Sequence, residues 1–286
     1  MSCLFELTVI CDNHAAEGLL PEHGLAFVLR ADKNNILFDT GSGETLIHNA
    51  TRLGIDLADI TYLVLSHGHF DHTGGIAQVL HLNEHCPLIA HPFVLSERYS
   101  RHPDLPVRRI SMPFSVQAAL QQLSPIRLRC QSVSSMLSNN VGVTGKIPRT
   151  SLFEDTGGPF YIDEAGQFND AIPDDQALWI NTPQGLVIIL GCCHAGVVNT
   201  IEYIRHLAGE SRVAGIIGGL HLLHVSPERI EQTLIYLKKL KPDFIYAGHC
   251  TGDDVIVTMH ENLRDSAVSQ LYAGMHIGTV NRLLCS

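Results

Sequence analysis

Four side chains that commonly bind metal ions occur within six consecutive positions of this chain. They lie in the stretch LVLSHGHFDHTGG, and they are His67, His69, Asp71 and His72. Imidazole and carboxylate groups are ligands that suit zinc, iron and manganese. The stretch follows the apolar run at 62–65, which we expect to be a strand buried on both faces. A solvated loop that is rich in histidine by chance is the alternative, but this spacing favours a metal site.

The placement of these four residues allows two ions to be bound side by side. After a strand, His67 and His69 can project together from an extended loop. Asp71 and His72 then open the following turn and helix, where they can face a second ion nearby. Water bound between paired metal ions becomes a hydroxide near neutral pH and can attack an electrophile. We therefore treat Asp71 as a candidate catalytic residue as well as a candidate ligand.

Further ligands have to come from elsewhere, and three more histidines share one sequence context. Each follows an apolar run that ends in glycine: they are His194 in VIILGCCHAG, His221 in GIIGGLHLL and His249 in FIYAGHCTG. Residues just beyond the carboxyl ends of strands converge on one crevice in α/β folds. We expect His194 and His249 to bind metal, and His194 also to act in catalysis. A hydrogen-bonded structural histidine is the alternative for each, and it explains His221 equally well.

Two residues after earlier strands are expected to support the ligands. Asp39 in ILFDTGSG ends a strand, and we interpret it as a carboxylate that orients a metal-binding histidine. It could instead, or in addition, cap the helix expected at 43–54. His91 in IAHP has the same context, but the proline after it fits a structural role equally well.

Apolar periodicity predicts strands that alternate with helices over most of the chain. The expected strands are 3–11, 26–30, 35–39, 62–65, 87–90, a strand–turn–strand at 177–190, 213–219 and 243–248. The expected helices are 43–54, 74–85, 195–209, 226–240 and 253–263, and the fourth has Ser226 as its N-cap and Pro227 in its first turn. This order fits a layered α/β sandwich with mixed sheets.

One long segment lacks this regularity. Residues 100–175 are rich in proline, glycine, serine and threonine, with short strands expected around 126–133 and 159–162. The segment has too few periodic apolar positions for a core of its own. We therefore interpret the chain as a single domain of residues 1–286 with an irregular insert at about 100–175.

The composition narrows the classes of partner. The 286 residues are 45% hydrophobic and 17% charged, which is ordinary for a globular protein with a sizeable core. The formal net charge of −10 argues against nucleic-acid binding, which relies on an excess of lysine and arginine. We find neither a signal-peptide pattern nor a run of about 20 apolar residues. We therefore expect a cytoplasmic protein with no membrane partner.

The eight cysteines do not have the spacing of a metal or redox motif of their own. No two of them form a Cys-x-x-Cys pair, which excludes a zinc ribbon and a thioredoxin-type motif. In a cytoplasmic protein we expect free, mostly buried thiols. Disulfide bonds are the less expected alternative.

These motifs together resemble the metallo-β-lactamase superfamily, because DTG, SHGHFDHTGG and a late GH occur in the expected order. The resemblance implies an αββα sandwich of two mixed β-sheets flanked by helices, with metals at one edge of the sheets. It implies that His67 and His69 serve one metal, and that Asp71 and His72 serve the other. His249 matches the final histidine motif. Two divalent ions are expected, with zinc favoured and iron or manganese as alternatives.

The chain departs from the superfamily pattern at one point. Many members have an intermediate histidine and a bridging aspartate, whereas here the strand LVIIL ends in GCCHAG. The resemblance therefore leaves open whether His194, Cys192 or Asp175 completes the site. His221 and His91 remain candidates for a supporting position.

A narrower resemblance bears on the reaction. EHGLAF, VTGKIPRT, DDQALWI and GCCHAGVVNT are similar to a branch related to 7,8-dihydropterin-6-methyl-4-(β-D-ribofuranosyl)aminobenzene-5'-phosphate synthase. This implies transfer of a pterin-methyl group with loss of pyrophosphate, although hydrolysis uses the same Lewis-acid chemistry. Lys146 and Arg149 could hold a phosphate, and His23 could lie at the pocket mouth; ordinary loop positions are the alternatives.

We therefore expect a metal-dependent hydrolase or pterin-type group transferase that acts on a small anionic or phosphorylated molecule. A di-iron redox protein is an alternative, but such members carry a flavin domain and a glutamate within the histidine cluster, and this chain has neither. A non-catalytic metal or ligand sensor is the other alternative. The sequence does not indicate the substrate or the oligomeric state.

Overall fold

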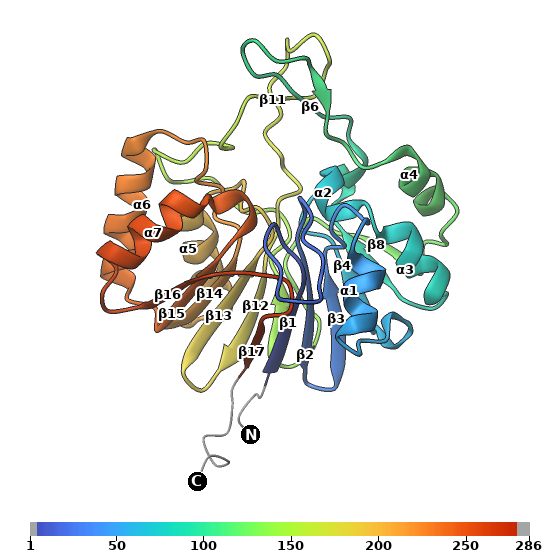
Figure 1. Ribbon diagram of the computed structural model, residues 1–286, viewed down its shortest axis with the longest axis horizontal. Coiled ribbons are helices and arrows are strands. Elements are labelled where there is room, and N and C mark those ends of the chain that lie inside the picture. The colour runs from blue at the N-terminus through green and yellow to red at the C-terminus, as the bar shows by residue number, and fades with distance from the viewer. Residues whose placement is uncertain (1–4, 279–286) are drawn as a thin grey trace.

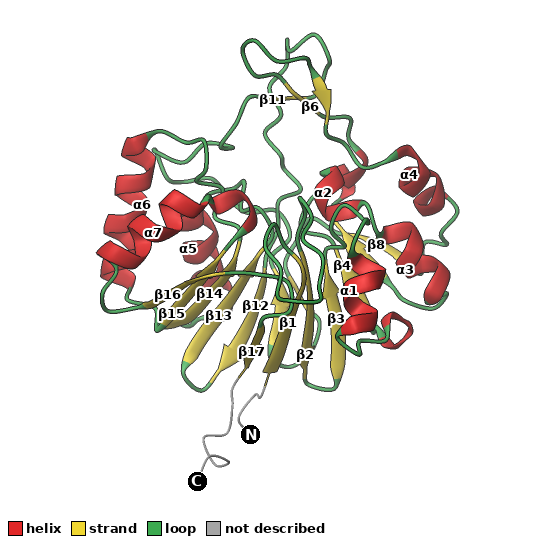
Figure 2. Ribbon diagram, viewed as in Figure 1, coloured by secondary structure: helices red, strands yellow, loops and turns green. Residues whose placement is uncertain are grey.

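The chain folds into four layers, helix–sheet–sheet–helix, in the computed structural model, which describes residues 5–278 (Figure 1). Two sheets of seven strands each lie in the middle, and helices cover their outer faces (Figure 2). The predicted sandwich of two mixed sheets flanked by helices is therefore confirmed. The first residues of the expected strand 3–11, together with Cys3 and Cys285, lie outside the described residues.

The first sheet carries the histidine-rich loop. Its strands are β1 (Phe5–Cys11), β2 (Ala26–Ala31), β3 (Asn34–Phe38), β4 (Tyr62–Val64), β5 (Leu88–Ala90), β8 (Leu128–Cys130) and β17 (His276–Gly278). Their order is β17-β1-β2-β3-β4-β5-β8; β1 to β3 pair antiparallel, whereas β3, β4, β5 and β8 run parallel. The helical elements beside it are α1 (Leu46–Arg52), η1 (Leu57–Asp59), α2 (Phe70–Thr73), α3 (Ile76–Leu82), η2 (Pro92–Leu95) and α4 (Phe114–Gln121).

The second sheet carries the other candidate ligands. Its strands are β9 (Ser135–Met136), β10 (Val141–Val143), β12 (Leu178–Thr182), β13 (Gly185–Leu190), β14 (Val213–Gly218), β15 (Phe244–Ala247) and β16 (Ala267–Gln270). Strands β13 to β16 run parallel. The helical elements on this side are α5 (Val197–Ala208), α6 (Pro227–Leu240), η3 (His249–Thr251) and α7 (Asp253–Asn262). No helix between residues 5 and 278 combines the length and apolar character that a membrane span requires.

Both faces of the central strands are buried, which explains their continuous apolar runs. In β13, Leu186 and Ile188 pack under the helices of the second half, whereas Val187 and Ile189 pack between the two sheets. Because successive side chains of a strand point to opposite faces, a strand between two layers needs apolar residues at every position. The molecule therefore has three apolar layers, one between the sheets and one beneath each set of helices.

The segment 100–175 contributes short strands to all three sheets, among them β8 and Phe160–Tyr161 where strands were expected around 126–133 and 159–162, and it also contains α4. Within β10, Gly142 lies against the ring of Trp179, where a side chain would overlap. A small third sheet contains β6 (Tyr99–Ser100), β7 (Arg108–Arg109) and β11 (Phe160–Tyr161). It stands above the edge of the sandwich where α2 lies, at the opposite end from the termini (Figure 1).

A local sequence signal accounts for the start of α6. Ser226 accepts a hydrogen bond from the backbone N–H of Arg229 and Pro227 opens α6, as predicted.

The cysteines between residues 5 and 278 are free, in agreement with the expectation of reduced thiols; they are Cys11, Cys86, Cys130, Cys192, Cys193 and Cys250.

A buried arginine joins the segment before β12 to the histidine-rich loop. Arg98 is fully buried, and its guanidinium pairs with Asp174 and, through Nε at 2.8 Å, with Asp170. Asp174 Oδ2 also accepts a hydrogen bond from the backbone N–H of Gly68 at 2.9 Å. Because Gly68 lies between His67 and His69, this ion cluster helps to hold the loop in place.

Replacing Arg98 with methionine should destabilise the fold strongly, because it leaves two buried carboxylates without their cation. We expect the free energy of unfolding to fall by about 3 to 5 kcal/mol, measured by urea denaturation. The matched control is Arg205→Met, since Arg205 pairs with Glu202 at the surface of α5. That change should cost about 1 kcal/mol or less. Equal effects of the two substitutions would contradict the assigned role of Arg98.

Candidate metal centre

The candidate ligands meet because parallel strands of both sheets end at the same edge. On the first sheet, His67 lies in the loop after β4, and His72 lies in α2, which follows that loop. On the second, the ends of β13 and β15 lead to His194 and His249. The ring centroids of His67 and His194 are 4.8 Å apart, and those of His72 and His249 are 5.1 Å apart. The predicted convergence of strand ends thus brings the two halves of the chain to one cluster.

Asp39 organises the part of the cluster that belongs to the first sheet. Its Oδ2 atom accepts hydrogen bonds from Ser66 Oγ at 2.6 Å and from His72 Nδ1 at 2.7 Å. Because the Ser66 hydroxyl donates its one hydrogen to Asp39, it accepts from His67 Nδ1 at 2.8 Å. Both histidines are therefore protonated at Nδ1 and present an unprotonated Nε2 to the cluster. This is the arrangement in which a supporting carboxylate orients metal-binding imidazoles.

Asp39 does not cap the following helix. The N-cap of α1 is Thr45, and Asp39 lies upstream with a φ of 62°. A positive φ is uncommon for a residue with a side chain and is best tolerated by aspartate and asparagine. The carboxylate points instead at His72, which matches the expected supporting role.

The histidines from the second sheet are oriented in the same way. His194 donates from Nδ1 to the carbonyl oxygen of Thr156 at 3.0 Å, and His249 Nδ1 lies 3.1 Å from Asn13 Oδ1. Both therefore direct Nε2 into the cluster. Thr156 and Asn13 are functional partners that sequence reasoning missed, because neither belongs to a motif and both lie far from their histidines along the chain.

The inward-facing atoms form a donor set that fits transition-metal ions. Nε2 of His69 and Nε2 of His194 are buried without a hydrogen-bond partner. Leaving buried polar nitrogens unsatisfied is costly unless a ligand completes them. Among the described residues, four groups have ligand atoms within 4.8 Å of one another: His67–Cys192–His194, His72–Cys192–His249, Cys192–His221–Cys250 and His23–Asp71–His249. Imidazole, thiol and carboxylate donors at this density fit zinc or iron far better than magnesium or calcium.

Burial and neighbouring charges keep three histidines of the cluster in the form that binds metal at neutral pH. Burial, reinforced by neighbouring positive groups, lowers the pKa of His67, His69 and His194 well below the ordinary value. These imidazoles are therefore neutral at pH 7, which is the form that binds metal. Burial opposes ionisation of Asp71, but the adjacent histidines outweigh it and hold its pKa below the usual range. Against burial, Asp71 in turn raises the pKa of His249 to about 9.

The cluster forms the floor of a pocket of about 450 Å³. The mouth includes residues from the small third sheet and from the loops beside it. Its walls are largely apolar, and they include Phe70, Leu105, Ile110, Phe160 and Leu223. Arg108 is the one lysine or arginine among the described residues that line it, and its guanidinium lies 4.7 Å from the centre of the Phe70 ring. A pocket of this size can hold a small organic molecule.

Comparison with known proteins agrees with this geometry. Residues 19–249 match the family model described as the metallo-beta-lactamase superfamily. The chain belongs to the metallo-β-lactamase superfamily. It is 30% identical over 247 residues to 7,8-dihydropterin-6-methyl-4-(beta-D-ribofuranosyl)-aminobenzene-5'-phosphate synthase from Methanocaldococcus jannaschii, with 81% of each chain covered. It is also 27% identical to an uncharacterized protein of the same archaeon, covering 86% of this chain and 90% of that protein.

Solved structures of the superfamily share the fold over nearly the whole chain. A metal-dependent hydrolase of the β-lactamase superfamily superimposes with a TM-score of 0.78 at 26% identity, covering 96% of this chain and 98% of the other. A metallo-β-lactamase fold protein from Bacillus subtilis has a TM-score of 0.59 at 11% identity, covering 96% and 99%. The second similarity shows the fold alone.

The structure does not bring Lys146 and Arg149 to the metal-site pocket of this superfamily member. They line a separate cavity of about 290 Å³, together with Asp175. Arg149 donates from Nη1 to the carbonyl oxygen of His194 at 2.7 Å, and Asp175 Oδ2 accepts from the N–H of Ala195 at 2.6 Å. Arg149 and Asp175 therefore contact the backbone at His194 and Ala195 rather than the His194 ring. Burial raises the pKa of Asp175 to about 7.

The other predicted residues divide between the pocket and the scaffold. His23 reaches the pocket, where its Nε2 atom lies 3.3 Å from Asp71 Oδ2. His221 also lines the pocket, and its ring centroid is 4.2 Å from that of His194. His91 instead caps η2, because its Nδ1 atom accepts a hydrogen bond from the N–H of Phe93 at 3.2 Å. The alternative that the sequence allowed for His91, a structural role, matches this contact.

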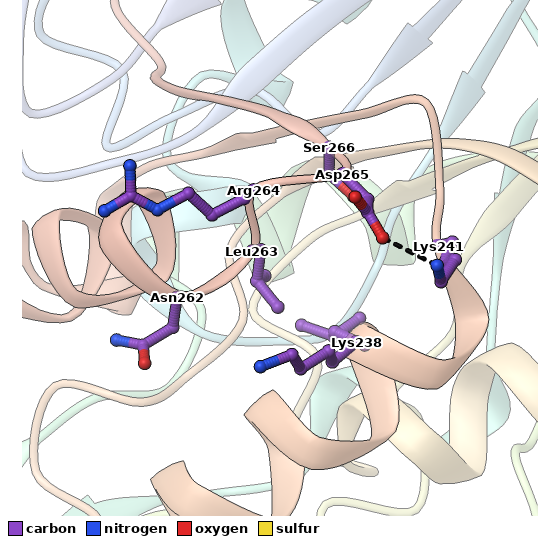
Figure 3. A pocket seen from close by; sticks show the side chains of 8 residues that line it. Lys238, Lys241, Asn262, Leu263, Arg264, Asp265 and Ser266 are labelled. Atoms are coloured by element: carbon purple, nitrogen blue, oxygen red, sulfur yellow. Dashed lines mark ion pairs between the residues drawn. The ribbon is translucent and has the colours of Figure 1, made fainter.

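One surface depression differs in its residues from the candidate metal centre. It lies at the end of α6 beside the connection from α7 to β16 (Figure 3). Its charged groups include an exposed ion pair between Lys241 and Asp265 at 2.6 Å. The described residues that line it include no histidine or cysteine, so it lacks the donors that the candidate metal centre concentrates.

Replacing Asp39 with asparagine should weaken metal binding without unfolding the protein. Asparagine tolerates the same backbone conformation, but a neutral amide holds the Nδ1–H of His72 more weakly and disrupts the contact to Ser66. We expect zinc affinity to fall by about 10- to 100-fold in competition with a chromophoric chelator. Asp56→Asn is the control, because Asp56 caps η1 away from the cluster. Unchanged affinity in the Asp39 variant would contradict its orienting role.

Proposed function

We propose that this protein is a metal-dependent hydrolase or group transferase that acts on a small anionic molecule at a dinuclear centre. The observation that carries the proposal is the set of buried imidazoles whose Nε2 atoms converge on the floor of an open pocket. The names of two relatives support it, since one is a pterin-related phosphate synthase and the other a metal-dependent hydrolase. Zinc is the metal that we favour, because the donor set combines imidazole and thiol groups.

In this proposal the two sheets contribute to both ions. One ion would be held by His67, His69 and His194, and the other by Asp71, His72 and His249. When bound, such ions supply Lewis acidity and a hydroxide that forms near neutral pH. The hydrogen bonds from Asp39 and Ser66 keep Nε2 of the first-sheet imidazoles unprotonated and aimed inward.

Asp71 is the residue that we propose orients the attacking oxygen. Its Oδ2 atom lines the pocket and lies 3.3 Å from Nε2 of both His23 and His249. There it would accept a hydrogen bond from the attacking oxygen. His23 would pass the proton of that oxygen to solvent, because its side chain is 59% exposed. His194 would act in catalysis as a ligand, because its Nε2 atom at the pocket floor has no other partner.

The pocket mouth supports an anionic substrate with an apolar body. Arg108 supplies the positive charge, and its position over Phe70 limits where a bound anion can sit. Phe160 and Leu223 offer apolar surface for the remainder of the molecule. Hydrolysis and group transfer make the same demands on these residues, so the pocket fits both reactions.

We also propose that the protein acts on small molecules in the cytoplasm. The open pocket favours turnover over ligand sensing, because His23 and Arg108 can be reached from solvent. The net charge of −10 disfavours nucleic acid as a substrate. Free thiols beside the metal centre suit a reducing compartment.

Protein purified without chelator or added metal should contain about two equivalents of zinc, iron or manganese per chain, as measured by elemental analysis. His69→Ala should lower the metal content and abolish turnover, because it removes a ligand whose Nε2 atom has no other partner. His81→Ala is the matched control, since His81 lies exposed on α3. Full activity of the His69 variant would refute the proposed function.

Arg108→Ala should raise KM for anionic substrates and leave kcat nearly unchanged. A hydrogen bond to a charged group contributes about 1.5 to 3 kcal/mol, so KM should rise by about 10-fold or more. The test uses chromogenic phosphate esters, with an uncharged carboxylic ester as the reference substrate. Lys146→Ala is the control, because Lys146 lies in the separate cavity. A larger effect of the Lys146 change would place the anion in that cavity instead.

A further inference from the structure

We propose that the Sγ atom of Cys192 is a bridging ligand, bonded as a thiolate to both metal ions. The proposal rests on the metal-dependent function proposed above, and it identifies the residue that joins the two halves of the centre. Cys192 is the residue shared by the two donor groups that contain His67 with His194 and His72 with His249. A ligand atom that lies within reach of both groups has the position that a bridge requires.

The distances agree with coordination by sulfur. Cys192 Sγ lies 3.1 Å from His72 Nε2, and the ligand atoms of each group are within 4.8 Å of one another. Sulfur and nitrogen atoms bound to the same tetrahedral zinc ion are about 3.5 Å apart, given bond lengths of about 2.3 and 2.0 Å. Small movements of these side chains would therefore complete both coordination shells.

The backbone around Cys192 is built for a close approach to the first sheet. β13 ends at Leu190, and Gly191 then passes beside Ser66 and Asp39. A Cβ atom at position 191 would overlap Ser66 Oγ, so glycine is required there. Because Gly191 lies this close to Ser66 and Asp39, the next residue, Cys192, comes close to the two residues that orient the first-sheet histidines.

The two adjacent cysteines have different surroundings. Cys192 is 3% exposed, lines the pocket and points at imidazole nitrogen. Cys193 has a φ of 61° and directs its Sγ atom to Thr200 Oγ1 at 3.4 Å, beside α5. Cys193 therefore belongs to the apolar layer under the helices, where it acts as a small buried side chain. It provides a matched control for any effect assigned to Cys192.

The chemistry balances without an oxidant. The Cys192 thiol loses its proton to solvent as two sulfur–metal bonds form, and no electron is transferred. A thiolate between the ions favours zinc over manganese or magnesium, because soft sulfur ligands select softer metals. The bridge would therefore tune which metal the centre holds, in addition to joining the two ions.

Cys250 is the competing source of sulfur. It forms a further donor group with Cys192 and His221, and its Sγ atom lies 3.5 Å from the carbonyl oxygen of Cys192. It belongs to that one group, whereas Cys192 belongs to three. Cys250 therefore lies to one side of the cluster, outside the two imidazole groups, and it is not the sulfur ligand that we propose.

X-ray absorption spectroscopy of the zinc-loaded protein tests the bridge directly. A bridging Cys192 gives about one sulfur neighbour per zinc at about 2.3 Å, whereas one terminal thiolate gives about half of that. Metal content is measured on the same samples. Cys192→Asp should keep two zinc ions, because a carboxylate can also bridge, but should lose all sulfur scattering. Cys193→Ser and Cys250→Ser should keep the wild-type spectrum.

Other outcomes separate this proposal from the proposed function. Two zinc ions with no sulfur neighbour, or with about half a sulfur per zinc, would overturn the bridge and leave the dinuclear function standing. Loss of the sulfur signal in Cys250→Ser, with retention in Cys192→Asp, would transfer the ligand role to Cys250 and overturn the proposal. No bound zinc in the wild-type protein, even after reconstitution, would overturn both.

Discussion

The rest of the site depends on the hydrogen bonds that Asp39 accepts. Its carboxylate binds the Nδ1–H of His72 directly and reaches His67 through the hydroxyl of Ser66. An imidazole that donates from Nδ1 has its lone pair at Nε2, so one buried carboxylate sets the protonation pattern of two inward-facing rings. Without that constraint the rings of His67 and His72 could turn, and their Nε2 atoms would no longer be held facing the cluster.

The fold creates this constraint by ending parallel strands of two sheets at one edge. The first sheet contributes the loop after β4, and the second contributes the residues after β13, β14 and β15. Gly191 permits the two edges to touch at Ser66, and the buried cluster of Arg98 with Asp174 holds the loop backbone at Gly68. The candidate ligands thus lie just beyond the ends of buried strands, whereas the residues of the pocket mouth come from the third sheet and surface loops.

Most of the fold and of the cluster could be predicted, because the signals for them are local. Wholly apolar runs mark strands that are buried on both faces, and a polar residue after such a run marks the active edge of the sheet. Arg108, the positively charged residue of the pocket, could not be predicted because no local signal marks it. Arg108 lies in an exposed two-residue strand with no periodic pattern, whereas Lys146 and Arg149 have a conspicuous glycine-flanked spacing but face another cavity.

The sequence by itself determined the layered fold, the superfamily and the types of donor atom, since these follow from hydrophobic pattern and motif order. Only the tertiary structure decided which donors lie close together. Thr156 and Asn13 orient His194 and His249 from positions 38 and 236 residues away along the chain, and no local pattern encodes such partners. Cys192 likewise acquires its place between two histidine groups from the contact of two sheets. Distances between side chains that are remote in sequence are set by packing, which is why the ligand arrangement could not be read before the strands were assembled.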